Sequence, residues 1–263
     1  MVILNRFRDT MHSLFNSNLS SKIKLLGTER KIIEQAKVLI TGDIHGRLDP
    51  IYRLFENFHP TEKDIIVILG DVGLNYTGTI RDRIIKEELS AMKSIFFCIH
   101  GNHENRPQNI ASYKKKKWHK GRVLYEEDFP NILFPIDGDI FDMGGKKCIV
   151  IGGAYSVDKF YRIQMGYNWW ADEQPTPVIK KYVEKQIKSN KIDIIFSHTC
   201  PYKYIPTECL LPVIDQSKVD NSTEKWLDIV EDNIDYKAWY IGHWHINKHI
   251  DRMHFLFHEV ELL

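Results

Sequence analysis

Short apolar runs recur along the chain from residue 37 onward, and most of them stop at a glycine or a histidine. The runs span residues 37–41, 64–69, 94–99, 147–151, 192–196 and 236–241. Continuous apolar runs of this length are typical of strands that are buried on both faces of a sheet. Segments with helical spacing of apolar residues lie between them, at 50–58, 80–92, 177–189 and 223–232. This alternation predicts a layered α/β fold, and the last stretch, 246–260, predicts a hairpin.

The first 36 residues follow a different pattern. Leu4, Phe7, Met11 and Leu14 recur at helical spacing and predict one amphipathic helix. This helix either packs on the rest of the protein or docks a partner, and packing is the simpler interpretation. We therefore divide the chain into an N-terminal helical extension, 1–36, and one domain, 37–263, because no linker rich in glycine, proline or serine interrupts the latter.

Composition narrows the classes of protein to which the chain can belong. Its 263 residues are 43% hydrophobic, which is typical of a globular protein. The net charge of +1 gives no general attraction to nucleic acid or to an anionic membrane. No apolar stretch approaches the roughly 18 residues that a membrane span needs. The four cysteines form no CxxC pair, so we expect buried thiols, a reducing compartment and a cytoplasmic protein without membrane partners.

Residues that can bind metal or phosphate follow five of the predicted strands. They form the motifs GDIHG (42–46), GDVG (70–73), GNHE (101–104), SH (197–198) and GHWH (242–245). In open α/β sheets, ligands bind at the carboxyl ends of strands, and glycine lets the backbone approach closely. Each motif alone is common in loops, but five such motifs, each at the end of a buried strand, indicate one shared metal site. Mixed oxygen and nitrogen donors suit Mn, Fe, Zn or Ni better than Ca or Mg.

The order of these motifs resembles that of the calcineurin-like metallophosphoesterases. Their pattern is DxH, GDxx(D), GNH(D/E), a histidine at a strand end and GHxH, and the chain has each block in order between residues 42 and 245. The segments GGAYSVDKFYR and WWADEQP are similar to a bacterial or phage-type branch. The resemblance implies a sandwich of two mixed β-sheets flanked by helices, in four layers αββα. It also implies a hydrolase of phosphate esters with a centre of two divalent metal ions at the strand ends.

The resemblance further implies roles for single residues. The implied metal ligands are Asp43, His45 and His245 for one ion, Asn102, His198 and His243 for the other, and Asp71 as the bridge between them. A hydroxide that bridges the metals would attack phosphorus in line, and His103 would protonate the leaving oxygen as the general acid. Manganese is the ion that we expect to support activity in vitro.

The chain departs from the protein serine/threonine phosphatases of this family. That branch has an acidic residue three positions after the bridging aspartate, where this chain has Leu74, and an arginine before GNHE, where it has His100. Another carboxylate must then orient His103, and the candidates are Asp158, Asp172 and Glu173. Other cations must bind the phosphate group, and Arg106 and Arg162 are the candidates, with Arg47 as a weaker third, because arginine binds phosphate through two parallel hydrogen bonds.

Three functions remain open at this point. We favour a phosphomonoesterase over a phosphodiesterase that acts on nucleotides or nucleic acid. The lysine-rich run 114–120 is expected to be a solvated loop, although it could border the site and attract a nucleic acid through Trp118. A non-catalytic scaffold is a third alternative, which the full set of ligands and His103 disfavours. The sequence leaves the oligomeric state open.

Overall fold

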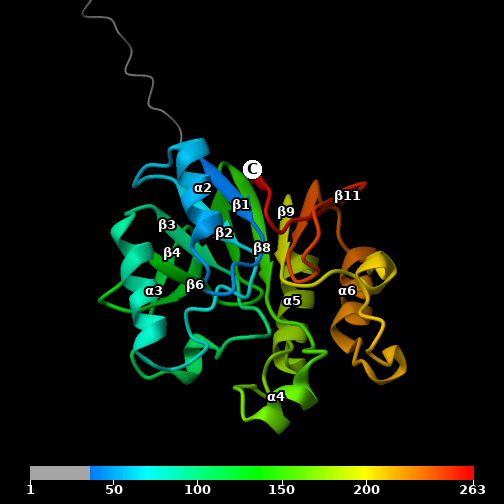
Figure 1. Ribbon diagram of the computed structural model, residues 1–263. Helices are drawn as coiled ribbons and strands as arrows, with labels where there is room; N and C mark the ends of the chain where they lie inside the picture. Colours follow the sequence, from blue (N-terminus) through cyan, green and yellow to red (C-terminus); the bar gives the residue numbers. More distant parts are fainter. Residues whose placement is uncertain (1–35) are drawn as a thin grey trace, which may run out of the picture. The chain divides into compact units, whose positions relative to one another are not determined.

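In the computed structural model, which describes residues 36–263, two β-sheets pack face to face and helices cover both outer faces (Figure 1). The helix predicted between Leu4 and Leu14 lies outside the described residues, and the division of the chain at residue 36 stays a prediction. No helix between residues 36 and 263 is both long enough and apolar enough to cross a bilayer.

The first sheet has seven strands in the order β13-β1-β2-β3-β6-β5-β4. Their bounds are Val38–Thr41 (β1), Ile65–Ile68 (β2), Ile95–Cys98 (β3), Lys114–Trp118 (β4), Gly121–Tyr125 (β5), Ile132–Pro135 (β6) and Val260–Leu262 (β13). Strands β1, β2, β3 and β6 are parallel, whereas β13, β5 and β4 pair antiparallel with their neighbours. The carboxyl ends of β1, β2 and β3 therefore lie at the same edge.

The second sheet has six strands in the order β11-β12-β10-β9-β8-β7. Their bounds are Ile140–Met143 (β7), Lys146–Ile151 (β8), Ile194–Ser197 (β9), Ala238–Ile241 (β10), Lys248–Ile250 (β11) and Met253–Phe255 (β12). Strands β8, β9, β10 and β12 are parallel, and β7 and β11 are antiparallel edges. Strands β11 and β12 form the hairpin that was predicted over 246–260.

Five α-helices flank the sheets in the described part of the chain: α2 (Asp49–Phe58), α3 (Ile80–Ala91), α4 (Lys159–Met165), α5 (Pro177–Ser189) and α6 (Ser222–Asp232). Four of them lie where the apolar spacing predicted a helix. Helix α3 begins where Thr79 accepts a hydrogen bond from the Arg81 amide, and α5 begins where Thr176 accepts one from Ile179. Helix α4 was not predicted, and none of its residues is buried.

Alternate residues of the buried strands point into different layers of the core. In β1, Val38 and Ile40 face the other sheet, whereas Leu39 packs in the layer that contains residues of α2 and α3. In β9, Ile194 faces the first sheet, whereas Ile195 packs with residues of α5 and α6. Strands with both faces buried explain the continuous apolar runs. The predicted four-layer αββα sandwich is confirmed.

The lysine-rich run is a strand and not the loop that the sequence suggested. Residues Lys114–Trp118 form β4, which pairs with β5 and is the edge of the first sheet. Trp118 stacks on Phe97 at the inner face, with ring centroids 5.4 Å apart, while most of the lysines are exposed. Lysine on an edge strand discourages pairing with other chains, which gives this run a structural purpose.

Candidate metal centre

The side chains predicted to bind metal converge in two groups from the ends of β1, β3, β9 and β10. In the first group, His45 Nε2 lies 2.9 Å from His245 Nε2, although 200 residues separate them, and His245 Nε2 lies 3.3 Å from Asp43 Oδ2. In the second group, Asn102 Oδ1 lies 2.8 Å from His198 Nε2. The His243 ring lies beside His198, with centroids 4.9 Å apart.

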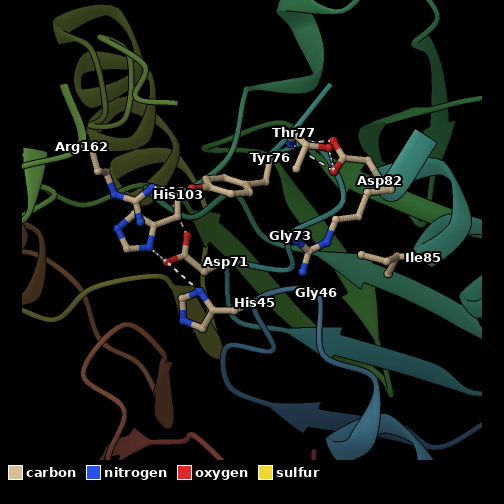
Figure 2. Close-up of a pocket in the computed structure, with 11 residues that line it drawn as sticks. His45, Gly46, Asp71, Gly73, Tyr76, Thr77, Asp82, Ile85, His103 and Arg162 are labelled. Atoms are coloured by element: carbon tan, nitrogen blue, oxygen red, sulfur yellow. Dashed lines mark hydrogen bonds and ion pairs between the residues drawn. The ribbon is translucent and has the colours of Figure 1, made fainter. Parts of the chain in front are cut away.

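Asp71, which follows β2, lies between these two groups, and Figure 2 shows it beside His45 and His103. Its Oδ2 is 4.0 Å from Nδ1 of His45 and 3.7 Å from Nε2 of His198. The same oxygen is 3.3 Å from Nδ1 of His103. A single carboxylate therefore reaches both groups, which is the position that the predicted bridge requires. All seven predicted ligands and His103 are gathered in one place.

The backbone around the centre adopts conformations that bring these side chains together. His45, Asp71, His243 and His245 all have a left-handed backbone, with φ between 44° and 64°. Non-glycine residues rarely adopt this conformation, and it is concentrated at functional sites. Gly101 allows a close approach, because a Cβ there would lie 1.9 Å from Asp71 Oδ1. Glycine beside a ligand is thus required at this motif, as the sequence suggested.

Two of the predicted ligands are oriented by hydrogen bonds to residues outside the centre. The Nδ1 of His198 donates to the Leu69 carbonyl at 2.8 Å, which directs Nε2 toward Asn102 and Asp71. The Asn102 amide nitrogen donates to Ser156 Oγ at 2.9 Å, so Oδ1 points inward. Metal-binding histidines in proteins are commonly held by such an outer hydrogen bond.

The electrostatic state of the centre suits a divalent cation. Burial alone would raise the pKa of Asp71, but His198, His103 and His45 outweigh it and hold that pKa below its ordinary value. Burial, together with His198, lowers the pKa of His243 to about 3. The centre thus offers ionised carboxylates at Asp43 and Asp71 and a neutral imidazole at His243, protonation states that bind metal. Ligand atoms of Asp43, His45 and His245 all lie within 4.8 Å of one another, as do those of Asp43, Asp71 and His198.

Of the three carboxylates considered for orienting His103, Asp158 is the one that contacts it. Its Oδ1 lies 3.3 Å from His103 Nε2, on the side of the ring away from Asp71. The other two candidates are engaged elsewhere: Asp172 accepts from the Asn109 side chain, and Glu173 accepts from Trp169. Burial alone lowers the pKa of His103, but Asp71 and the hydrogen bond to Asp158 outweigh it and hold the pKa above its ordinary value.

Arg162 lies beside His103 at a small polar cavity of about 210 Å³ (Figure 2). Its Nε donates to Asp158 at 2.7 Å, and its Nη1 donates to the Tyr76 hydroxyl at 3.0 Å. His45 and Asp71 line the same cavity, so an anion held there would meet both the arginine and the centre. Tyr76 was not predicted, although it lies only three positions after the GDVG motif.

Arg106, the other predicted phosphate contact, occupies a different position. Only 3% of the residue is exposed, its Nη1 donates to Asp137 Oδ2 at 2.6 Å, and its Nε donates to the Asp172 carbonyl. It lines neither of the cavities that border the centre. This buried ion pair supports a structural role and does not support the substrate contact that its place after GNHE suggested.

We expect Arg106→Met to destabilise the fold by about 3–5 kcal/mol, because it leaves the buried Asp137 carboxylate without its cation. Urea unfolding of the full chain measures this loss. The double variant Arg106→Met with Asp137→Asn removes both charges and should recover part of the stability. A loss below about 1 kcal/mol in the single variant would contradict the structural role.

A second and larger cavity, which we call the apolar cleft, also reaches His103. It encloses about 730 Å³ and is bordered by His103, Asn102, His243 and residues of the 202–221 segment between β9 and α6. Glu224 of α6 also lines it, with 3% of the residue exposed. No signal in the sequence marked Glu224, because glutamate on a helix is normally a solvated residue.

The pKa of Glu224 predicts a pH-dependent stability. Burial raises this pKa from 4.5 to about 7, so the folded protein holds a proton that the unfolded chain loses near pH 4.5. The free energy of unfolding therefore falls as the pH rises from 4.5 to about 7, and above pH 7 it is lower by the full cost of ionising the buried carboxyl group. We expect the stability of Glu224→Gln relative to the wild type to increase by about 2 kcal/mol from pH 5 to pH 8. Urea unfolding of the variant and the wild type at pH 5 and at pH 8 measures this increase. The same stability difference between the two proteins at both pH values would contradict the prediction.

Comparisons with known proteins give one match to a family. The profile of the family described as calcineurin-like phosphoesterase matches residues 36–247, and no curated protein matches the chain. Among solved structures, TT1561 of Thermus thermophilus is 13% identical with a TM-score of 0.49, over 87% of this chain and 98% of that chain. The protein of unknown function AQ665 from Aquifex aeolicus is 12% identical with a TM-score of 0.31, over 61% and 77%.

Proposed function

Because the chain belongs to the calcineurin-like phosphoesterase family and is a metal-dependent phosphoesterase, we propose that it hydrolyses phosphate monoesters at a centre of two divalent metal ions. The observation that supports this most directly is the position of Asp71. One carboxylate lies within 4.0 Å of histidine nitrogens from both groups of side chains. A single-metal site would not need a shared acid between two sets of donors.

The proposed ligands divide as the two groups do. Asp43, His45 and His245 would hold one ion, Asn102, His198 and His243 the other, and Asp71 both. When bound, the two ions would acidify a water molecule and offset the negative charge of the phosphoryl oxygens. The described residues fit this task because the lowered pKa values of Asp71 and His243 keep the carboxylate ionised and the imidazole neutral.

We assign His103 the role of general acid. Oδ1 of Asp158 accepts a hydrogen bond from Nε2 of His103 and holds the ring. This leaves Nδ1 of His103 facing the metal centre. The raised pKa of His103 keeps the ring protonated over a wider range of pH. A protonated Nδ1 beside the reacting group would donate its proton to the leaving oxygen, a contribution typically of about 10² to 10⁴ in rate.

The small polar cavity favours a monoester. A phosphate monoester carries more negative charge than a diester, and Arg162 supplies a cation at the cavity that His45, Asp71 and His103 also line. A phosphodiesterase is the second candidate, because the apolar cleft offers room for another ester group. The lysine-rich strand β4 lines neither cavity, so it adds no support for a nucleic-acid substrate.

Hydrolysis of a matched pair of substrates tests the proposal. The full chain, loaded in parallel with Mn, Fe, Zn or Ni, is assayed with p-nitrophenyl phosphate and with bis(p-nitrophenyl) phosphate. We expect the monoester to be hydrolysed with the higher kcat/KM. A higher value for the diester would favour the phosphodiesterase, and no turnover of either ester with any metal would overturn the proposal.

We expect Arg162→Met to raise the KM for p-nitrophenyl phosphate by about tenfold, because a charge-assisted contact with phosphate is lost. The KM for the diester should rise less, since that substrate carries less charge. Arg83→Met is the matched control, because Arg83 is exposed on α3 and pairs with Glu87 and Asp128 away from both cavities. Equal effects on the two esters would contradict a role in binding the phosphate charge.

A further inference from the structure

Four residues of the candidate metal centre line the apolar cleft, namely Asp71, Asn102, His243 and His245, but the proposed function gives no role to the rest of its wall. Its volume of about 730 Å³ lies within the range of cavities that hold small molecules in proteins. Half-buried aliphatic side chains line it in a segment that is otherwise largely exposed, namely Ile205, Leu210, Ile214 and Val219. Tyr155, Tyr202 and Trp244 add aromatic surface. The cleft therefore suits an apolar group with rings.

Two residues that line the cleft, Glu224 and Trp244, each have a buried polar side-chain atom without a hydrogen-bond partner among residues 36–263. Glu224 Oε1 accepts a hydrogen bond from Thr199 Oγ1 at 2.9 Å. The other oxygen, Oε2, is buried and has no hydrogen-bond partner within residues 36–263. When Glu224 is ionised, above about pH 7, this oxygen is an unsatisfied buried acceptor, and a ligand N–H or O–H would recover the free energy that it costs.

His103 borders both the small polar cavity and the apolar cleft. A general acid must lie within hydrogen-bond reach of the oxygen that it protonates. If the phosphoryl group is held at the centre with Arg162 on its polar side, the leaving oxygen beside His103 would direct the rest of the substrate into the apolar cleft.

On this basis, and resting on the proposed function, we propose that the apolar cleft binds the alcohol portion of the phosphoester. The structure assigns this portion as a mainly apolar, ring-containing group with a hydrogen-bond donor directed at Glu224. The substrate class is thus a phosphate ester of an aromatic or similarly flat alcohol, and not of a sugar or a short polar alcohol.

Binding of phosphonates that cannot be hydrolysed tests the cleft independently of turnover. The Mn-loaded full chain is titrated by calorimetry with methylphosphonate, 1-naphthylmethylphosphonate and indol-3-ylmethylphosphonate. We expect the naphthyl probe to bind at least about tenfold more tightly than the methyl probe, because its rings enter the cleft. We expect the indolyl probe, which adds an N–H, to bind about fivefold more tightly than the naphthyl probe.

Two variants and a matched control locate the effect. Ile214→Ser, on the cleft wall, should remove most of the preference for the naphthyl probe over the methyl probe. Val213→Ser, at a neighbouring residue that is 89% exposed and does not line the cleft, should keep that preference. Glu224→Leu should abolish the advantage of the indolyl probe while the naphthyl probe still binds.

The outcomes separate this proposal from the proposed function. If the wild type binds all three probes equally tightly and still hydrolyses p-nitrophenyl phosphate, the proposed role of the cleft is wrong and the proposed phosphoesterase activity stands. If the ring-containing probes bind tightly but no ester is hydrolysed, the proposed role of the cleft is supported and the proposed monoesterase activity is wrong. A loss of preference in Val213→Ser as large as in Ile214→Ser would also count against the cleft.

Discussion

Asp71→Asn is expected to lower the metal content of the protein from two ions per chain to one or fewer, and to reduce kcat/KM by more than about 10²-fold. Loss of a residue that only supports a metal ligand commonly costs about 10- to 100-fold in affinity or activity, so loss of a bridging ligand should cost more. The amide keeps the shape of the carboxylate but removes its charge. It also places an NH₂ group among the nitrogens of His45, His103 and His198.

Elemental analysis of the purified variant and its activity with p-nitrophenyl phosphate measure the two effects. Asp142→Asn is the control, because Asp142 is a carboxylate on β7 that pairs with Lys120 and lines neither cavity at the centre. Circular dichroism of both variants shows whether the fold is kept. Two bound ions and unchanged turnover in Asp71→Asn would end the proposal of a bridged centre.

Strands buried on both faces were the part of the fold that the sequence predicted best. The runs around β1, β2 and β3 are apolar throughout because one face packs on helices and the other on the second sheet. Strand β4 escaped prediction because its residues are largely lysines, whose exposure at a sheet edge leaves no apolar pattern. Helix α4 escaped for a related reason, since it buries no residue.

The residues of the site also differ in how well the sequence predicted their positions. Motif residues at strand ends were predicted together because parallel strands deliver their carboxyl ends to one edge. The contacts around them depend on loops whose course no spacing specifies. Asp158 contacts His103 although 55 positions of sequence separate them. Arg106 lies only three positions from His103, but its side chain forms a buried ion pair with Asp137. Closeness in sequence was the wrong guide for Arg106, because burial of the charge decided its direction.

We expect His103→Ala to lower kcat for p-nitrophenyl phosphate by about 10- to 100-fold and for phenyl phosphate by up to about 10⁴-fold, with both metal ions retained. The two esters differ in how much their leaving oxygen needs a proton. Nitrophenolate is a stable anion and can depart unprotonated, whereas phenolate depends more on an acid. A general acid at this position must therefore show the larger loss with the poorer leaving group.

A second variant separates the acid itself from the residue that positions it. Asp158→Asn keeps a side chain of the same shape beside His103 Nε2 but removes the charge that helps to raise the pKa of His103. We expect its loss in kcat to be smaller than that of His103→Ala. The alkaline limb of the pH–rate profile, on which His103 loses its proton, should move to lower pH. Equal losses for the two esters in His103→Ala would assign the histidine to metal or phosphate binding, because a proton donor cannot be indifferent to the leaving group.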